Sequence, residues 1–569
     1  MANRVSETAA PEFKPYVAAT ETRKELTGRA ITLGALFGIL FGAVTVYVGL
    51  RAGLTVSASI PIAVLSISIL RAFGRATILE NNIVQTTGSA GESVAGGVIF
   101  TLPALFFLGF GLEYWRTFIL ALIGGWLGVF FMIPLRRQLI VKEHGNLLYP
   151  EGTACADVLV AGDRGGSFAS RVFAGLGLGA LYTLFQNENL FAAWPSQPTH
   201  NFTGYPGASI RANTTSEYMG VGYIIGPRIA GVLFSGGVFA WLVVMPAIKF
   251  FGSHFAGPLY PGTIPIAQMT PDQLYASYVR PMGAGAVAAA GLITLLRTLP
   301  TIVAALGAGA RQMGQNAAAA MTTRKRTEDD LDLRWALAGA GLLIVAIWAY
   351  LTFRPVPGAA TGALQNILAA VFVVIFGFLF VTVSSRITGL IGSSSNPISG
   401  MAIATLMATC AIFLLLGWTA NPYAALAISV GGVVCIASAN AGNTSQDLKT
   451  GFLVGATPRR QQIALMIGVA VSVFAIGGTL ILMNRALEEF RPTSIALDLN
   501  NLPPGVSVDT RGFHRKGDSV QVTTAAAGQN AESAPATAVS VQGDVLLNAI
   551  NSPVVPDGKY FFNPKTGKA

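Results

Sequence analysis

The sequence is poor in charged residues, which make up 11% of its 569 residues. Soluble domains carry about 25% charged residues, because their surface has to meet water. With hydrophobic residues at 52% of the chain, the composition predicts a surface that mostly faces lipid. The 65 glycines agree with this prediction, since small residues let helices pack closely within a membrane.

Cysteine and histidine are also scarce. The three cysteines (Cys155, Cys410 and Cys435) lie in apolar surroundings and are too few for a disulfide framework. The four histidines are scattered without the spacing of a metal site. No nucleophile elbow, zinc-protease motif or phosphate-binding loop with its lysine is present. We therefore expect no metal, no cofactor and no enzymatic activity.

The net charge of +10 does not indicate a nucleic-acid partner. No segment combines dense basic residues with aromatic ones, as a nucleic-acid surface would. The basic residues instead gather in short loops between apolar segments, where they mark the cytoplasmic side of a membrane. The first 30 residues are polar and charged, unlike a cleavable signal peptide, and predict a solvated cytoplasmic arm.

A membrane-spanning helix needs about 20 mostly apolar residues. Clear candidates are residues 31–50, 54–73, 117–135, 168–185, 286–306, 335–353, 364–383, 401–418, 424–439 and 463–483. A half-polar span follows at 81–110, and residues 218–251 are long enough for two spans, divided by Gly226-Pro227 and Gly236-Gly237. With basic loops inside, the pattern gives about 13 crossings and a cytoplasmic N-terminus.

These spans predict an all-α, polytopic membrane helix bundle in five parts. They are a cytoplasmic N-terminal arm (1–30), a first membrane half (31–309), a cytoplasmic linker (310–334), a second membrane half (335–483) and a polar periplasmic tail (484–569).

An internal repeat relates the two halves. Residues 53–62 align without a gap on residues 389–398, sharing Gly-Leu, two serines and Pro-Ile at equal spacing. Further on, Asn-Ile-Val-Gln at 82–85 resembles Asn-Thr-Ser-Gln at 443–446. Each repeat begins after a span that runs inward, so we expect parallel copies. Duplicated halves commonly enclose a transport pathway.

Four polar stretches interrupt the apolar pattern, at residues 80–93, 145–157, 384–400 and 439–449. Each combines glycine or proline with hydroxyls, amides or carboxylates, and we expect discontinuous or re-entrant helices there. Polar groups at membrane depth must be satisfied by protein or by a water-filled cavity. Amides offer donors and acceptors that suit peptide bonds. The predicted substrate-binding residues are Asn82, Gln85, Ser89, Tyr149, Ser394, Ser395, Asn396, Asn443 and Gln446.

Carboxylates in these stretches are candidates for proton coupling or for contact with a cation. They are Glu92, Glu151, Asp157 and Asp447. A salt bridge or a helix cap is the alternative for Glu151 and Asp157. We expect Glu80 to be an interface residue near Arg75. Two alternatives stay open for Arg386, which either pairs with an acidic group or marks the cytoplasmic edge.

At these stretches the sequence resembles the oligopeptide transporter family, in particular its bacterial members. The similar segments are ENNIVQTTGSAGES (80–93), GNLLYPEGTACADVL (145–159), RITGLIGSSSNPISGM (386–401) and GNTSQDLKTGFLVGATPRRQQ (442–462). The resemblance covers residues 25–483 and implies a secondary transporter driven by proton symport. Its substrates would be small peptides or, as in the yellow-stripe-like branch, metal chelates. It also implies further hydrophobic helices where this chain has its polar tail.

The sequence thus predicts a proton-coupled importer of oligopeptides in a bacterial inner membrane, surrounded by lipid. Uptake of a metal chelate is the alternative within transport, and a channel or an intramembrane enzyme are alternatives of another class. The sequence leaves open whether the chain acts alone or as a homodimer.

Overall fold

The structure is a computed structural model of the chain. It describes residues 13–300 and 325–486, with short gaps at 53–54, 56, 75, 109, 111–112, 166, 188–189, 263 and 357–358 and at single positions within 284–299. It also describes parts of 497–562. The predicted span at 286–306 lies largely outside the described residues.

Helices dominate the described chain, as predicted. They are α1 (Gly28–Ala52), α2 (Ser59–Ala72), α3 (Ile78–Ile99), α4 (Ala104–Phe107), α5 (Tyr114–Arg136), α6 (Pro150–Arg164), α7 (Ser167–Gln186), α8 (Ser216–Phe239), α9 (Met245–Gly252), α10 (Pro271–Leu274), α13 (Leu333–Phe353), α14 (Ala363–Ile391), α15 (Ile398–Leu415), α16 (Asn421–Val454) and α17 (Pro458–Ala486). Within the described residues, nine helices are long and apolar enough to cross a membrane. The polytopic helix bundle is confirmed.

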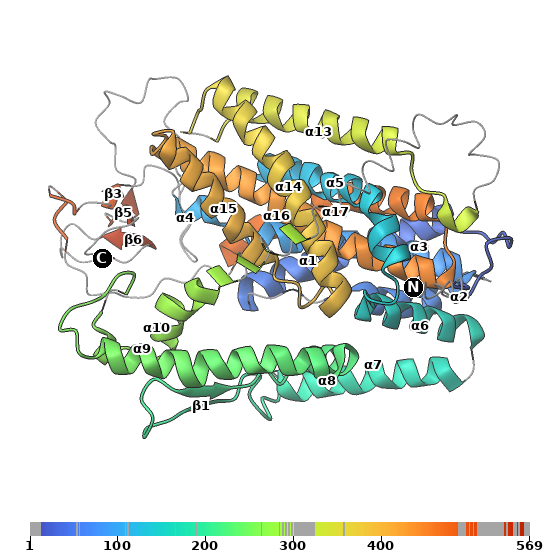
Figure 1. Cartoon of the computed structure of the whole chain (residues 1–569), viewed down its shortest axis with the longest axis horizontal. Helices are drawn as coiled ribbons and strands as arrows, with labels where there is room; N and C mark the ends of the chain where they lie inside the picture. Colours follow the sequence, from blue (N-terminus) through green and yellow to red (C-terminus); the bar gives the residue numbers. More distant parts are fainter. Residues whose placement is uncertain are drawn as a thin grey trace, which may run out of the picture.

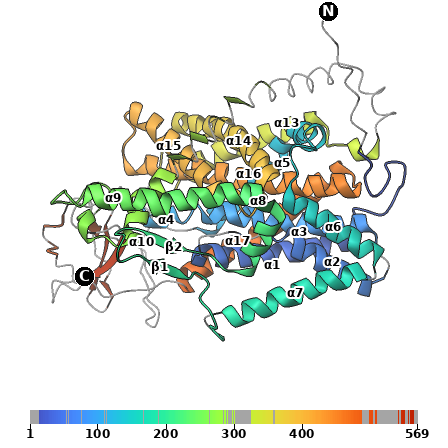
Figure 2. The same cartoon turned by 60° about the horizontal axis from the view of Figure 1, so that its bottom comes forward.

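Two helices form the centre of the bundle. All of α3 is buried, and α16 lies beside it along much of its length. Figure 1 and Figure 2 show the other long helices packed around this pair, with α7, α8 and α9 running along one side of the bundle and α13 along another. The central pair therefore contains the polar stretches that the sequence places at membrane depth.

The packing around the centre follows the predicted repeat. Helix α3 packs against α1, α2 and α17, while α16 packs against α14, α15 and α5. In each half, a long helix and a short one cover the central helix of the same half. The next long helix after each central helix packs against the central helix of the other half. Helix α5 follows α3 and packs against α16, and helix α17 follows α16 and packs against α3. These crossed contacts interlock the two halves.

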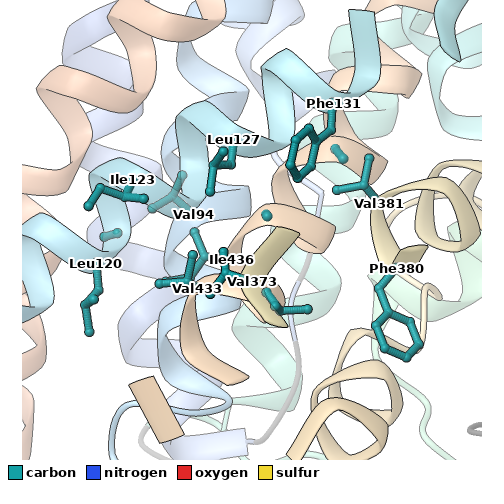
Figure 3. Packing of buried hydrophobic residues seen from close by; sticks show 14 of the residues in the cluster. Val94, Leu120, Ile123, Leu127, Phe131, Val373, Phe380, Val381, Val433 and Ile436 are labelled. Atoms are coloured by element: carbon teal, nitrogen blue, oxygen red, sulfur yellow. The ribbon is translucent and has the colours of Figure 1, made fainter. Parts of the chain in front are cut away.

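Apolar side chains fill the space between these helices. Val94 of α3, Leu127 of α5 and Ile436 of α16 are fully buried in the largest core cluster, which also includes Val373 of α14. Figure 3 shows these side chains lying close together. Several glycines allow the backbones to approach: a Cβ atom on Gly128 would lie 2.6 Å from the carbonyl oxygen of Ala437.

Local signals set the ends of the central helices. Helix α3 begins at a capping box, in which Thr77 accepts from the Glu80 N–H and Glu80 accepts from the Thr77 N–H. These bonds satisfy N–H groups that have no partner within the helix. Helix α16 ends at Gly455, whose φ of 84° lies in the left-handed region. Glycine adopts this region without the clash of a Cβ atom.

Two of the four polar stretches contain no backbone break, contrary to our expectation. Residues 80–93 lie within α3, and residues 439–449 lie within α16, which runs unbroken for 34 residues. Helix α14 likewise continues through the polar residues 384–391. The backbone leaves the helix only at 143–149, before α6, and at 392–397, before α15. Buried side-chain partners hold the polar segments helical.

Other spans also differ from the prediction. We predicted two spans within residues 218–251. The structure has a single apolar segment at residues 226–252, because α8 continues through Ala240–Val244 into α9. The break occurs only at Gly226, which has a φ of 76°, and Gly236-Gly237 remains helical. Helix α2 has 14 residues, too few for an ordinary crossing.

The described part of the N-terminal arm, residues 13–27, is anchored to the bundle at two points, although many of its side chains are exposed. The N–H groups of Tyr16 and Val17 donate to the carbonyls of Leu453 and Val454 at the end of α16. Glu25 is 2% exposed and accepts bonds from Arg326 and Thr457. These bonds join the arm to the segment before α13 and to the turn between α16 and α17.

The few strands lie outside the bundle. Strands β1 (Thr199–Asn201) and β2 (Ser209–Arg211) form an antiparallel pair in the loop between α7 and α8. In the C-terminal tail, β5 (Asp544–Ala549) pairs with β3 (Val506–Val508), β4 (Ser540–Val541) and β6 (Gly558–Phe562).

We expect Gly128→Ala to lower the free energy of unfolding by about 1–3 kcal/mol, because the new methyl group overpacks the contact between α5 and α16. Thermal unfolding in detergent measures the change. Gly177→Ala in α7 is the control, since nothing lies within 4 Å of the added Cβ atom. An equal loss of stability in both variants would contradict the proposed tight packing.

Candidate functional site

A network of polar side chains lies between the two halves, with Asp447 at its centre. Asp447 of α16 is fully buried. Its Oδ1 atom accepts from Gln85 Nε2 at 2.5 Å and from Ser59 Oγ at 3.3 Å. Its Oδ2 atom accepts from Ser89 Oγ at 2.5 Å. All three donors belong to the first half of the chain, so this carboxylate joins α16 to α2 and α3.

A second carboxylate binds the start of α2. Glu92 of α3 is 5% exposed, and its Oε2 atom accepts from the backbone N–H of Ala58 at 2.6 Å. Ala58 is the N-cap residue of α2. The first N–H groups of a helix lack partners within it and carry a partial positive charge. Glu92 therefore satisfies one of these groups inside the bundle.

Glu151 binds the corresponding loop of the second half. It belongs to the first turn of α6 and accepts from the N–H groups of Ser393 and Ser394 at 3.1 and 3.2 Å. The Ser393 hydroxyl also donates to it at 2.7 Å. This is the loop that leads into α15, where Gly392 has a φ of 87°. Both oxygens of Glu151 are thus occupied by donors.

The two loops of the internal repeat meet at this point. The N–H of Ser57 donates to Ser394 Oγ at 3.1 Å, and Gln446 accepts from the Ser393 N–H at 3.2 Å. In the alignment of 53–62 with 389–398, Ala58 is equivalent to Ser394. Each of these equivalent residues donates its N–H to a buried glutamate. The structure thus brings the repeated segments face to face.

The predicted asparagines lie in or beside this network, and each keeps an acceptor unused. Asn443 donates to the carbonyl of Ser89 at 3.0 Å, and Asn82 donates to Gln85 at 3.3 Å. Asn396 donates to the hydroxyls of Ser384 and Thr388. The Oδ1 atoms of all three asparagines are buried without a hydrogen-bond partner. The network is therefore rich in acceptors.

The charges in the network have one sign. Glu151 and Asp447 lie within electrostatic range of Glu92. Among the residues that the structure describes, no lysine, arginine or histidine forms an ion pair with any of the three. No cluster of metal-ligating side chains occurs in this described part of the chain. Unpaired buried carboxylates favour contact with a cation or a proton.

A buried lysine one turn from the network has different partners. Lys449 is 1% exposed, and its Nζ atom donates to His144 Nδ1 at 2.7 Å and to the Leu147 carbonyl at 2.9 Å. It also lies 5.6 Å from the ring centre of Tyr149. Tyr149 is buried, and its N–H donates to the Gly389 carbonyl. Lys449 thus fastens the segment before α6 to α16.

The remaining candidates lie apart from the network. Asp157 is exposed on α6, and Ser395 is half-buried and takes no part in these bonds. Glu80 is fully buried and pairs with Arg29 at 2.7 Å, whereas Arg75 lies outside the described residues. Arg386 pairs with Glu143 at 3.0 Å, and both side chains are partly exposed, so the pair is compatible with either alternative that the sequence left open.

Several members of the network were not predicted as site residues. They are Ser57 and Ser59, which both lie in the aligned repeat. Outside the network, the burial of Glu25 was not predicted either, because a carboxylate in a polar arm carries no local sign of burial. The repeat could have indicated the two serines, since equivalent loops of duplicated halves commonly meet at the substrate path.

Comparisons with known proteins agree with this architecture. The profile of the family described as "OPT oligopeptide transporter protein" matches residues 25–498. A Haemophilus influenzae protein named "Putative oligopeptide transporter" is 29% identical over 458 residues, covering 77% of this chain and 70% of the relative. The "Iron-phytosiderophore transporter YSL15" of Oryza sativa subsp. japonica is 23% identical over 524 residues, covering 83% and 74%.

A third relative belongs to the same plant group. The "Probable metal-nicotianamine transporter YSL8" of Arabidopsis thaliana is 22% identical over 501 residues, covering 79% of this chain and 67% of the relative.

We expect the stability of the protein to fall in mild acid because of His144. Burial lowers the pKa of His144 below its ordinary value of 6.5, and the charge of Lys449 lowers the pKa further. The unfolded chain therefore takes up this proton first. The stabilisation by neutral His144 is complete above about pH 6.5 and is lost as the pH falls through the folded pKa.

Unfolding temperatures between about pH 8 and about pH 5 test this expectation. His144→Gln should lack this part of the pH dependence, because its amide does not titrate in that range. The same pH dependence in the wild type and in the variant would contradict a role for His144.

Proposed function

This chain belongs to the OPT oligopeptide transporter family, whose members are transporters and not enzymes, and we propose that it imports small peptides together with protons. The proposed location is a bacterial inner membrane, with the N-terminus in the cytoplasm. The central observation behind the coupling is Asp447, a buried carboxylate whose three donors all come from the other half of the chain.

The charge state of Asp447 is suited to controlling the contact between the halves. As a carboxylate it accepts three hydrogen bonds, and bonds to a charged group are roughly twice as strong as bonds between neutral groups. A proton removes the charge and occupies an acceptor position. The bonds that hold α16 to α2 and α3 then weaken. Alternating access requires such a contact between the halves to change.

Proton movement and substrate movement are linked if the substrate occupies the same region. The two repeated loops contribute serine hydroxyls there, and Asn82 and Asn443 contribute unused amide oxygens. Peptide bonds carry both donors and acceptors, so they complement this set. A bound peptide would thus contact elements of both halves at the point where Asp447 joins them.

A metal chelate is the second candidate substrate. Relatives in rice and Arabidopsis carry names that specify iron-phytosiderophore or metal-nicotianamine transport. A chelate brings its metal within its own ligands, so the transporter needs no metal site. Competition for uptake between a tripeptide and a ferric chelate distinguishes the two substrates.

We expect Asp447→Asn to abolish tripeptide accumulation driven by a pH gradient in proteoliposomes. Asparagine keeps the shape of the side chain but cannot take up the proton. Exchange of labelled for unlabelled peptide without a gradient should persist, because in exchange the transporter changes orientation with peptide bound in both directions. Flux that rises without saturation and ignores the gradient would instead indicate a channel.

Asp272→Asn serves as the matched control, since this carboxylate is 63% exposed and outside the network. It should accumulate peptide as the wild type does. Unchanged gradient-driven uptake by Asp447→Asn would overturn the proposed role of Asp447.

A further inference from the structure

The three buried carboxylates of the network differ in how many of their oxygens are occupied. Asp447 accepts from three side-chain donors through both oxygens. Glu151 accepts through both oxygens from the loop before α15. Glu92 accepts one N–H, through Oε2 alone. Among the described residues, no donor reaches the other oxygen of Glu92.

The three carboxylates also differ in how much of their surface is exposed. Asp447 is fully buried, whereas Glu92 keeps 5% of its surface exposed. A carboxylate oxygen has about two acceptor sites, and leaving these unused inside a protein costs free energy. The unoccupied acceptor capacity thus lies on Glu92, the most exposed of the three carboxylates, since Glu151 is 2% exposed. This arrangement suits a ligand with hydrogen-bond donors.

A second, independent feature lies beside Glu92. Asn443 of α16 is 2% exposed and has no donor at its Oδ1 atom. Its amide nitrogen binds the carbonyl of Ser89. Asn443 meets Ser89 and Asn440 meets Ser93, so Asn443 faces the turn of α3 that begins at Ser89 and carries Glu92. One turn further along, Ser93 donates to Asn440 of α16.

We propose that Glu92 and the amide oxygen of Asn443 bind the N-terminal ammonium group of the peptide substrate. An ammonium group has three donors and a positive charge. It fits a site that offers a carboxylate oxygen and an amide oxygen and that contains no protein cation among the described residues. Its charge also offsets part of the repulsion among the three carboxylates.

This assignment divides the work between two carboxylates. Asp447, with its full set of donors, carries the coupling proton, and Glu92 recognises the end of the substrate. Glu92 also binds the N-cap residue of α2. A bound ammonium group would therefore interact with the same carboxylate that positions this helix. The inference rests on the proposed peptide transport and specifies which end of the peptide the site binds.

Equilibrium binding to the purified full chain in detergent tests the assignment without a gradient. The probes are trialanine and N-acetyl-trialanine, which differ in the positive charge. We expect the wild type to bind trialanine about tenfold to a hundredfold more tightly, since a hydrogen bond to a charged group contributes about 1.5–3 kcal/mol. Glu92→Gln should bind both probes with the weak affinity of the acetylated one.

Two further variants make the test specific. Glu92→Asp keeps the charge and should retain a preference for trialanine, and it provides a result if Glu92→Gln does not fold. Glu113→Gln changes a carboxylate with 45% side-chain exposure before α5 and should bind as the wild type does.

The outcomes separate this inference from the proposed function. Equal binding of both probes by the wild type, or a preference that persists in Glu92→Gln, overturns the ammonium site. Failure of the wild type to bind either probe overturns it together with the peptide substrate. Normal binding preferences without gradient-driven uptake support the site and overturn only the proton coupling.

Discussion

Buried polar groups between α3 and α16 depend on partners within the protein, and this dependence shapes the centre of the molecule. Asp447 illustrates the constraint, because each of its oxygens accepts a bond from the opposite half. An unpaired polar group in an apolar medium costs several kcal/mol. The two central helices therefore depend on one another for more than apolar packing. The match between their polar faces is incomplete, since the Oδ1 atoms of Asn82 and Asn443 have no partner.

The internal repeat explains how one chain builds such a matched centre. Equivalent residues of the two copies, Ala58 and Ser394, each donate an N–H to a glutamate. The glutamates themselves are not equivalent in sequence position, since Glu92 belongs to a central helix and Glu151 begins α6. The two halves thus resemble one another in their loops and central helices, but different carboxylates hold the two loops. Of the three carboxylates, only Glu92 has an oxygen without a donor among the described residues.

A separate set of bonds fixes one end of the bundle. Glu25 joins the N-terminal arm to Arg326 and to Thr457, and Arg136 pairs with Asp330 just beyond. These contacts connect both halves near the ends of their helices. When the halves rearrange, these contacts must either break or move together with the helices, as must the bonds of the central network. The fold therefore has two places where charged bonds oppose movement.

The sequence by itself determined the membrane location, most of the spans and the identity of the polar residues, because hydropathy and residue type are local properties. The prediction failed where it treated polarity as a sign of a broken backbone. Helices α3 and α16 remain intact, because some polar side chains, such as Gln85 and Ser93, have partners on the other helix, and others, such as Thr87, donate to carbonyls of their own helix. Residues 85 and 447 are far apart in the chain, so no local pattern could pair them. Only the tertiary structure decided which carboxylate is saturated, which oxygen is free and which loops meet, since these depend on contacts between the halves.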